Sequence, residues 1–100
     1  MEMIQVLTCR LGEEMIAVDI RQVQEIHALA PCTPLPLSEP YIKGVVPIRG
    51  RLIPVMDLHA RFGLKQSLSD HQRLVILDSG ETLFAIIVDE TKDVGDSRWE

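Results

Sequence analysis

The sequence predicts an all-β fold of the sandwich or barrel type. About seven short apolar segments follow one another at close spacing, separated by glycine, proline or acidic residues. Hydrophobic residues make up 46% of the chain and aromatic residues only 4%, which predicts a core of isoleucine, leucine and valine. One hundred residues suffice for one such core, so we expect a single domain over residues 1–100.

The first two apolar segments predict a hairpin. They run from Ile4 to Arg10 and from Met15 to Asp19, and the Leu-Gly-Glu-Glu sequence between them suits an exposed turn. Hydrophobic side chains occupy both alternating positions of the first segment. At least one strand is therefore expected to be buried on both faces.

Residues 20–29 have two possible structures. A helical turn at Arg21 and Gln22, followed by a strand, fits the alternation that begins at Val23. A helix is the alternative, because apolar residues recur three or four positions apart, at Ile20, Val23, Ile26 and Ala30.

The next ten residues predict a surface connection. Residues 31–40 contain four of the six prolines, and each proline removes a backbone donor and biases its predecessor to an extended conformation. A Pro-x-x-Pro ligand for an aromatic groove is formally present at 31–34, but a crossover loop is the favoured interpretation. Ser38 is expected to cap a helical start at 38–41.

The middle of the chain predicts a hairpin with a basic tip. Its two apolar arms, 45–48 and 52–55, flank Arg49, Gly50 and Arg51. Gly50 supplies the positive φ of the reversal. Each arm also contains a proline, which confines that position to an edge, a bulge or a strand end. These prolines are Pro47 and Pro54.

Beyond this hairpin, the sequence predicts a short helix and a last hairpin. The helix, Leu-His-Ala-Arg-Phe at 58–62, ends at Gly63. Two strands, 73–78 and 82–89, then surround a turn that contains Gly80.

Three apolar segments end at an aspartate. An aspartate just past a buried strand is the residue type that caps the following turn. We therefore expect structural, non-catalytic roles for Asp19, Asp57 and Asp89.

Net charge and apolar run length limit the classes of partner. Ten basic and fifteen acidic residues leave a net charge of −5, which disfavours nucleic acid and anionic membrane as the main partner. No apolar run approaches the roughly 20 residues of a membrane span, and the N-terminus lacks a signal-peptide pattern. We expect a cytoplasmic protein without membrane insertion, in which Cys9 and Cys32 are buried thiols and not a disulfide.

The sequence contains no strong catalytic motif. His27, His59 and His71 lie far apart, without the close spacing that metal-ligand pairs normally show. Phosphate-binding glycine motifs and nucleophile-elbow motifs do not occur. The sequence therefore predicts neither an enzyme nor a metal or cofactor site. A small metal-binding β-barrel enzyme is the alternative from another class.

Three groups of residues carry a family resemblance. The middle of the chain holds Lys43-Gly44, Arg49-Gly50 and Pro54-Val55-Met56-Asp57-Leu58. Val18-Asp19-Ile20 precedes Val23-Gln24-Glu25-Ile26, and Val88-Asp89 closes the last apolar segment. The chain resembles the CheW-like domain family, which includes receptor-to-kinase coupling proteins and the regulatory domain of the chemotaxis histidine kinase. Where the family has Asn-Leu-Arg-Gly, this chain has Pro47-Ile48-Arg49-Gly50.

The resemblance implies a particular fold. It favours the turn and strand for residues 20–29, and it implies two small five-stranded SH3-like barrels. The middle of the chain would build one barrel and the two chain ends the other. A family member continues for about forty residues more, so the first barrel is expected to be incomplete. We expect strand exchange or edge pairing with a second copy to complete it, with Trp99 at the junction.

The resemblance also implies a function. It implies a non-catalytic scaffold that joins the cytoplasmic hairpin tip of a chemoreceptor to the regulatory domain of a chemotaxis histidine kinase. A fragment of a larger kinase regulatory domain, or of a coupling-protein fusion, is the alternative. For Arg49, a bond to carbonyls of its own turn is an equal alternative to partner binding. The expected partner-binding residues are Lys43, Val45, Val46, Arg49 and Arg51, and Gly44, Gly50 and Pro54 are expected to be structural.

Overall fold

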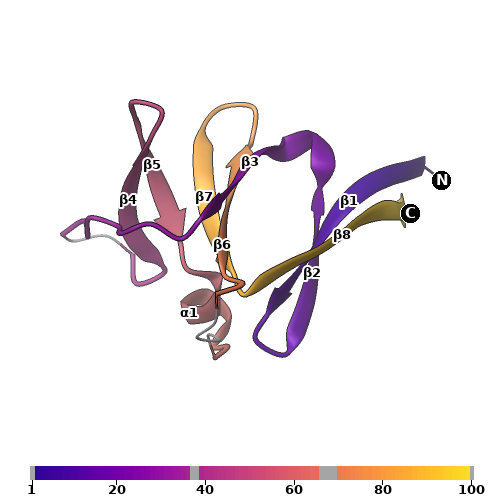
Figure 1. Cartoon of the computed structure of the whole chain (residues 1–100), viewed down its shortest axis with the longest axis horizontal. Helices are drawn as coiled ribbons and strands as arrows, with labels where there is room; N and C mark the ends of the chain where they lie inside the picture. The colour runs from indigo at the N-terminus through magenta and orange to yellow at the C-terminus, as the bar shows by residue number, and fades with distance from the viewer. Residues whose placement is uncertain (1, 37–38, 66–69, 100) are drawn as a thin grey trace.

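The computed structural model describes residues 2–36, 39–65 and 70–99, except the side chains of residues 2 and 96–99. Within these residues, eight strands form two sheets (Figure 1). The all-β prediction is therefore confirmed at the level of fold class.

The middle of the chain forms a five-stranded sheet. Its strands pair antiparallel except β5 and β7, which run parallel through Val55–Ala85 and Met56–Ile86. The edge strands are the first and last in the sheet order. That order is β3 (Val23–Ala28), β6 (Arg73–Asp78), β7 (Leu83–Val88), β5 (Arg51–Met56) and β4 (Ile42–Ile48).

The two ends of the chain form a three-stranded sheet. Its order is β2 (Glu14–Asp19), β1 (Glu2–Leu11) and β8 (Glu90–Trp99). In Figure 1, β1 and β8 lie side by side and bring the two termini together. The division into a central unit and a unit made from the chain ends is as predicted, but the second unit has three strands within the described residues.

Two short helices complete the fold. The 3-10 helix η1 (Ile20–Gln22) leads directly into β3, so residues 20–28 adopt the turn and strand and not the alternative helix. The α-helix α1 (Leu58–Phe62) connects β5 to the second half of the large sheet. Its last residue precedes Gly63, which has a left-handed φ of 68°.

The predicted helical start at 38–41 is not formed at residues 39–41. These residues make a single turn, in which the carbonyl of Glu39 accepts a hydrogen bond from the N–H of Ile42 at 2.9 Å. Strand β4 begins at once, because Ile42 already pairs with Met56. Ser38, the expected cap, lies outside the described residues.

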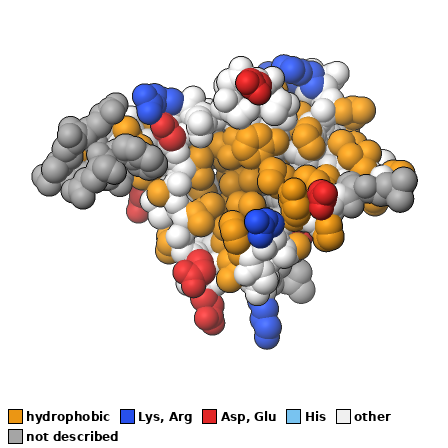
Figure 2. All heavy atoms as spheres, turned by 180° about the vertical axis from the view of Figure 1, so that it is seen from behind, with side chains coloured by type: hydrophobic (Ala, Val, Ile, Leu, Met, Phe, Trp, Pro, Cys, Tyr) orange, Lys and Arg blue, Asp and Glu red, His pale blue; other side chains and the backbone are white. Residues whose placement is uncertain are grey.

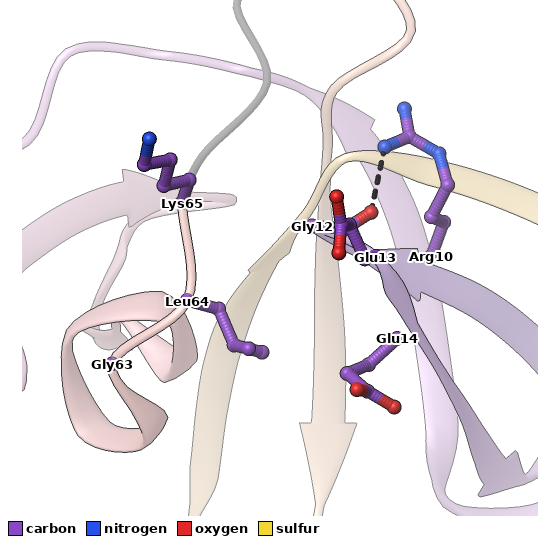
Figure 3. A pocket seen from close by; sticks show the side chains of 7 residues that line it. All are labelled: Arg10, Gly12, Glu13, Glu14, Gly63, Leu64 and Lys65. Carbon is purple, nitrogen blue, oxygen red and sulfur yellow. Dashed lines mark hydrogen bonds between the residues drawn. The ribbon is translucent and has the colours of Figure 1, made fainter.

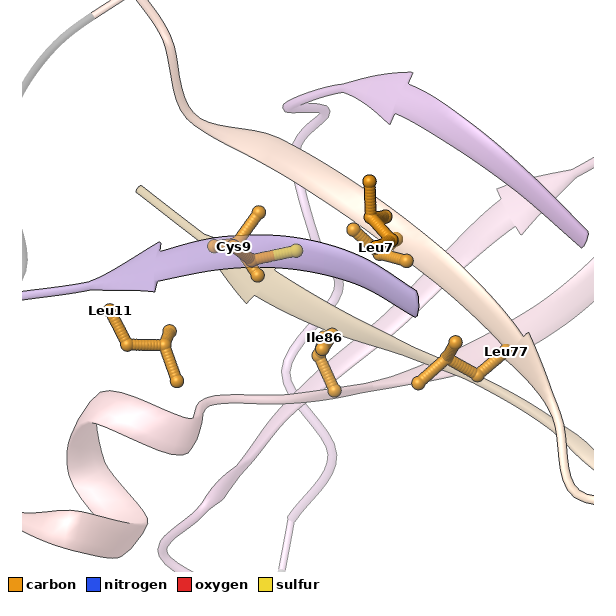
Figure 4. Close-up of a cluster of buried hydrophobic side chains, with 7 residues drawn as sticks. Leu7, Cys9, Leu11, Leu77 and Ile86 are labelled. Atoms are coloured by element: carbon orange, nitrogen blue, oxygen red, sulfur yellow. The ribbon is translucent and has the colours of Figure 1, made fainter. Parts of the chain in front are cut away.

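The core has two layers, one on each face of β6 and β7. One layer joins the two sheets, and Figure 4 shows Leu7, Cys9 and Leu11 of β1 against Leu77 and Ile86. The other layer lies beneath β4 and β5 and contains Val46, Ile53, Val55, Leu74, Ile76, Ala85 and Ile87. Strands β6 and β7 are thus buried on both faces. Each fully buried aliphatic side chain contributes about 1.5–3 kcal/mol.

Candidate protein-binding surface

The basic tip of the β4–β5 hairpin projects from the large sheet. Ile48 pairs with Arg51, which leaves a two-residue connection of Arg49 and Gly50. Both residues have a positive φ, 53° and 77° respectively. This is the geometry that the right-handed twist of a hairpin favours, and it turns the Arg49 side chain outwards, where 77% of it is exposed.

Alternation along the hairpin decides which predicted residues reach the surface. Lys43, Arg49 and Arg51 are exposed, and Val45 is partly buried. Val46 is only 2% exposed and lies in the core layer beneath the hairpin. Consecutive strand residues point to opposite faces of the sheet, so the Val46 side chain faces inwards and is not at the surface of the hairpin.

Sequence reasoning missed the most exposed apolar side chain of the hairpin. Leu52 is 71% exposed and pairs with the exposed Pro47 on the outward face. The signal was available in the sequence, because the neighbour of a buried Ile53 must face the other way. An apolar pair therefore stands beside the basic tip.

Arg49 is held by an acidic partner on the opposite edge strand. Its Nε lies 2.5 Å from Oε1 of Glu25 in β3, and Glu25 also bonds Nε2 of His27. The hydrogen bond from His27 and, second, that from Arg49 lower the pKa of Glu25 below its usual value. We call Glu25, His27 and Arg49 the surface cluster. It links the tip to β3, which neither sequence interpretation of Arg49 foresaw.

Gly44 is required by a close backbone approach. A Cβ at this position would lie 2.2 Å from the carbonyl oxygen of Thr33. Thr33 and Val45 exchange two backbone hydrogen bonds of 2.9 Å, so the proline-rich connection pairs with β4. Pro54 lies in β5 just before the pairing with β7 begins at Val55.

Two of the three aspartates cap the element that follows them. Asp19 accepts a hydrogen bond from the N–H of Arg21 at 3.0 Å, and hydrogen bonds from Arg21 lower the pKa of Asp19. Asp57 accepts from the N–H groups of His59 and Ala60 at 3.0 and 3.3 Å and so caps α1.

The third aspartate has a different role from the expected cap. No turn follows Asp89, since β8 begins at Glu90, and its side chain is fully buried. Its carboxylate reaches back 77 residues to accept the N–H of Gly12 at 2.5 Å. It also lies 2.9 Å from Nε2 of His59 and 3.4 Å from Nε2 of Gln72. Asp89 therefore connects distant parts of the chain.

A groove lies beside these contacts, between the β1–β2 turn and the residues that follow α1. Its volume is about 480 Å³. Figure 3 shows Leu64 pointing across the groove and Arg10 donating a 3.1 Å hydrogen bond to the carbonyl of Gly12. A Cβ on Gly12 would lie 2.9 Å from the carbonyl oxygen of Lys65, so the two walls meet closely at one end.

One face of the molecule is largely apolar. Figure 2 shows hydrophobic side chains gathered over the middle of this face and towards the end that carries β4 and β5, with charged side chains mostly around the rim. An exposed apolar area with a charged rim is typical of a protein–protein interface.

The described part of the chain was searched for metal-ligand clusters and for membrane-spanning helices. No three metal-ligating side chains gather among residues 2–36, 39–65 and 70–99, and no helix there is long and apolar enough to cross a membrane. Cys9 and Cys32 are free thiols. Cys9 is buried as expected, which raises its pKa to about 11, whereas Cys32 is only partly buried.

Comparisons with known proteins agree with the motifs. The model of the CheW-like domain matches residues 5–100. Chemotaxis protein CheW of Treponema pallidum is 34% identical over 93 residues, which cover 88% of this chain and 55% of that protein. CheW of Bacillus subtilis is 35% identical over 95 residues, which cover 85% of this chain and 61% of that protein. This chain thus spans little more than half the length of these relatives.

A solved structure shows the same fold. The crystal structure of scaffolding protein TtCheW from Thermoanaerobacter tengcongensis matches with a TM-score of 0.88 at 28% identity, covering 98% of this chain and 64% of that one. The match to a scaffolding protein agrees with the prediction that the chain is not an enzyme. From the motifs, the fold and these matches together, the chain belongs to the CheW-like domain family.

Proposed function

We propose that this chain is a non-catalytic scaffold of chemotaxis-type signalling in the cytoplasm. It joins the cytoplasmic hairpin tip of a chemoreceptor to the regulatory domain of a histidine kinase. The observation that carries this proposal is the family match over residues 5–100, together with the close structural match to a scaffolding protein. A rigid body with two binding faces transmits a signal by changing which docked state is favoured.

The β4–β5 hairpin is the proposed partner-binding surface. The surface keeps four of the residues predicted from the sequence, which are Lys43, Val45, Arg49 and Arg51. The exposed Pro47 and Leu52 are added, and the buried Val46 is left out. Arginine binds a carboxylate through two parallel hydrogen bonds, and an exposed leucine beside it supplies apolar contact area. Glu25 holds Arg49 in place before a partner arrives, which reduces the entropy lost on binding.

Replacing Arg49 tests this surface. Arg49→Ala should weaken binding to a chemotaxis kinase regulatory domain or to a receptor-tip peptide by about tenfold, as measured by isothermal titration calorimetry. Arg21→Ala is the matched control, because Arg21 is similarly exposed, at 70%, and also pairs with a carboxylate. Equal binding by wild type and Arg49→Ala would exclude Arg49 from the interface. Undetectable binding of wild type to both probes would contradict the scaffold function itself.

We also propose that a second copy can pair with an open edge of the three-stranded sheet. Strands β2 and β8 are its edges, and edge strands present unpaired backbone groups that other chains can use. The expected role of Trp99 in that junction concerns a side chain outside the described residues.

Light scattering during gel filtration tests the second copy. The chain should run as a dimer, and deletion of Val94 to Glu100 should shift it to a monomer, because this deletion removes more than half of β8. A monomeric wild type at all concentrations would reject pairing. A dimer that survives the deletion would move the junction away from β8.

A further inference from the structure

The α-helix α1 carries an arginine that contacts two aromatic rings. The guanidinium carbon of Arg61 lies 6.0 Å from the ring centroid of Tyr41 and 5.7 Å from the ring centroid of Phe62. Both distances fall within the roughly 6 Å over which a cation is attracted to the face of a ring. The two contacts restrict the arginine side chain before any ligand arrives, which reduces the conformational entropy lost on binding.

The guanidinium of Arg61 forms no ion pair with a carboxylate of the described residues. Arg21 and Arg49 are also exposed, but each of them pairs with a carboxylate of this chain. The carboxylate of Asp57, one turn before Arg61, instead accepts the first N–H groups of α1. A guanidinium has five N–H donors and keeps its charge at neutral pH, so Arg61 can serve an acceptor on another molecule.

The surroundings of this cation are apolar and accessible. Phe62 is 59% exposed, Arg61 is exposed and Tyr41 is partly buried. We call Tyr41, Arg61 and Phe62 the aromatic–arginine patch. Aromatic residues and arginine are enriched in protein–protein interfaces and among the residues that contribute most to binding energy. The composition of the patch is therefore that of a binding site for another protein.

The patch has a fixed position, away from the tip of the β4–β5 hairpin. The N–H of Asp57 donates a 2.7 Å hydrogen bond to the carbonyl of Tyr41, which fastens the residue before β4 to the start of α1. Figure 1 shows α1 at the end of β4 and β5 that lies opposite to their connection at Arg49 and Gly50. The patch and the hairpin tip are thus separate surfaces of one sheet.

We propose that the aromatic–arginine patch binds a protein segment in which an aspartate or glutamate is flanked by aliphatic residues. The carboxylate accepts two parallel hydrogen bonds from the guanidinium of Arg61, and an aliphatic neighbour covers the exposed ring of Phe62. An amide in place of the carboxylate offers one acceptor oxygen and no charge, so it binds more weakly. The proposal does not depend on which partners the scaffold joins.

Two short peptides that differ in one side chain test this chemistry. The probes are acetyl-Leu-Glu-Leu-amide and acetyl-Leu-Gln-Leu-amide, titrated into the whole chain and followed by NMR, which detects weak binding. The Nε–H resonance of Arg61 and the ring resonances of Phe62 should shift saturably with the glutamate peptide. Its dissociation constant should be about fivefold lower than that of the glutamine peptide. This difference should shrink at high salt, because the charges are exposed to solvent.

Substitutions at position 61 separate the charge from the geometry of the donors. Arg61→Gln removes both and should abolish the preference for the glutamate peptide. Arg61→Lys keeps the charge but loses the planar pair of donors, so its preference should be intermediate. Arg21→Gln is the matched control, because it changes the net charge equally at a side chain that is 70% exposed and pairs with Asp19. This control should keep the wild-type preference.

The aromatic contribution has its own variant. Phe62→Leu keeps an apolar side chain but loses the ring beside the guanidinium, and should weaken binding of the glutamate peptide by about twofold to fivefold. Equal affinity of wild type for both peptides, or the absence of a saturable shift at Arg61, would overturn the proposal. So would a preference for glutamate that survives in Arg61→Gln. No signalling partner enters these titrations, so their outcome is independent of the proposed scaffold function.

Discussion

Two histidine–carboxylate pairs in this molecule share the same chemistry but lie in different surroundings. Glu25 and His27 have side chains that are 25% and 36% exposed, at the edge of the large sheet. Asp89 and His59 are 0% and 3% exposed, at the junction of the two sheets. Water screens the first pair and compensates its groups when the pair breaks. The second pair depends entirely on its protein partners.

The difference in burial between the two pairs implies different contributions to the stability of the fold. The surface cluster is partly exposed to water, so its ion pairs add little to folding. The buried pair contributes to the position of one sheet against the other. The same two side-chain types therefore form a solvent-screened pair at the sheet edge and a buried pair at the junction of the sheets.

The largest effect is expected from removing the buried carboxylate. Asp89→Ala leaves the N–H of Gly12 and the ring of His59 without their acceptor, and should lower the free energy of unfolding by about 3–5 kcal/mol in urea titration. If that variant does not fold, the nearly isosteric Asp89→Asn should show a smaller loss. Asp93→Ala, an exposed position in β8, should change stability by less than about 0.5 kcal/mol. Equal losses of unfolding free energy in Asp89→Ala and Asp93→Ala would contradict the view that the buried pair depends on its protein partners.

An intermediate effect is expected at the β1–β2 turn, where the N–H of Gly12 donates a hydrogen bond to Asp89. Gly12→Ala places a Cβ 2.9 Å from the carbonyl oxygen of Lys65 at a φ of 60°, and should cost about 1–3 kcal/mol. Gly63→Ala is the matched control, because its φ is 68° and nothing lies within 4 Å of the new Cβ. The difference between the two variants measures the close contact alone. No difference would mean that the walls of the groove separate freely.

The smallest effect is expected from acid at the surface cluster. The hydrogen bonds from His27 and Arg49 lower the pKa of Glu25. Its contribution to stability is therefore present above the pKa of Glu25 in the unfolded chain and is lost as the pH falls through the lower folded value. A small stability difference between wild type and Glu25→Gln should be measurable at neutral pH and should vanish in acid. Glu81→Gln, in the exposed β6–β7 turn, should show no such change.

Local features were predicted best because they depend on neighbours in the sequence. The hairpin tip at Arg49 and Gly50, the cap at Asp57 and the end of α1 at Gly63 each require only a few adjacent residues. The burial of Val46 was missed, although strand alternation could have shown it. Its neighbours Val45 and Pro47 are also apolar, so composition alone does not identify the inward face.

Distant pairings could not be read from the sequence. Asp89 follows a buried strand as Asp19 and Asp57 do, and the same local pattern predicted the same capping role. Its actual partners lie 30 and 77 residues away, at His59 and Gly12. Only the packing of α1 and the β1–β2 turn against the end of β7 brings them within hydrogen-bonding distance.

The sequence by itself determined the strands up to β7, the hairpin turns, the family and the basic hairpin tip, because each depends on local backbone preference or on a contiguous motif, whereas β8 was not predicted. The tertiary structure alone decided which of three similar aspartates is buried, which carboxylate holds Arg49 and which histidine lies between two acidic groups. The physical reason is that desolvation and long-range hydrogen bonding act between residues that only folding brings together.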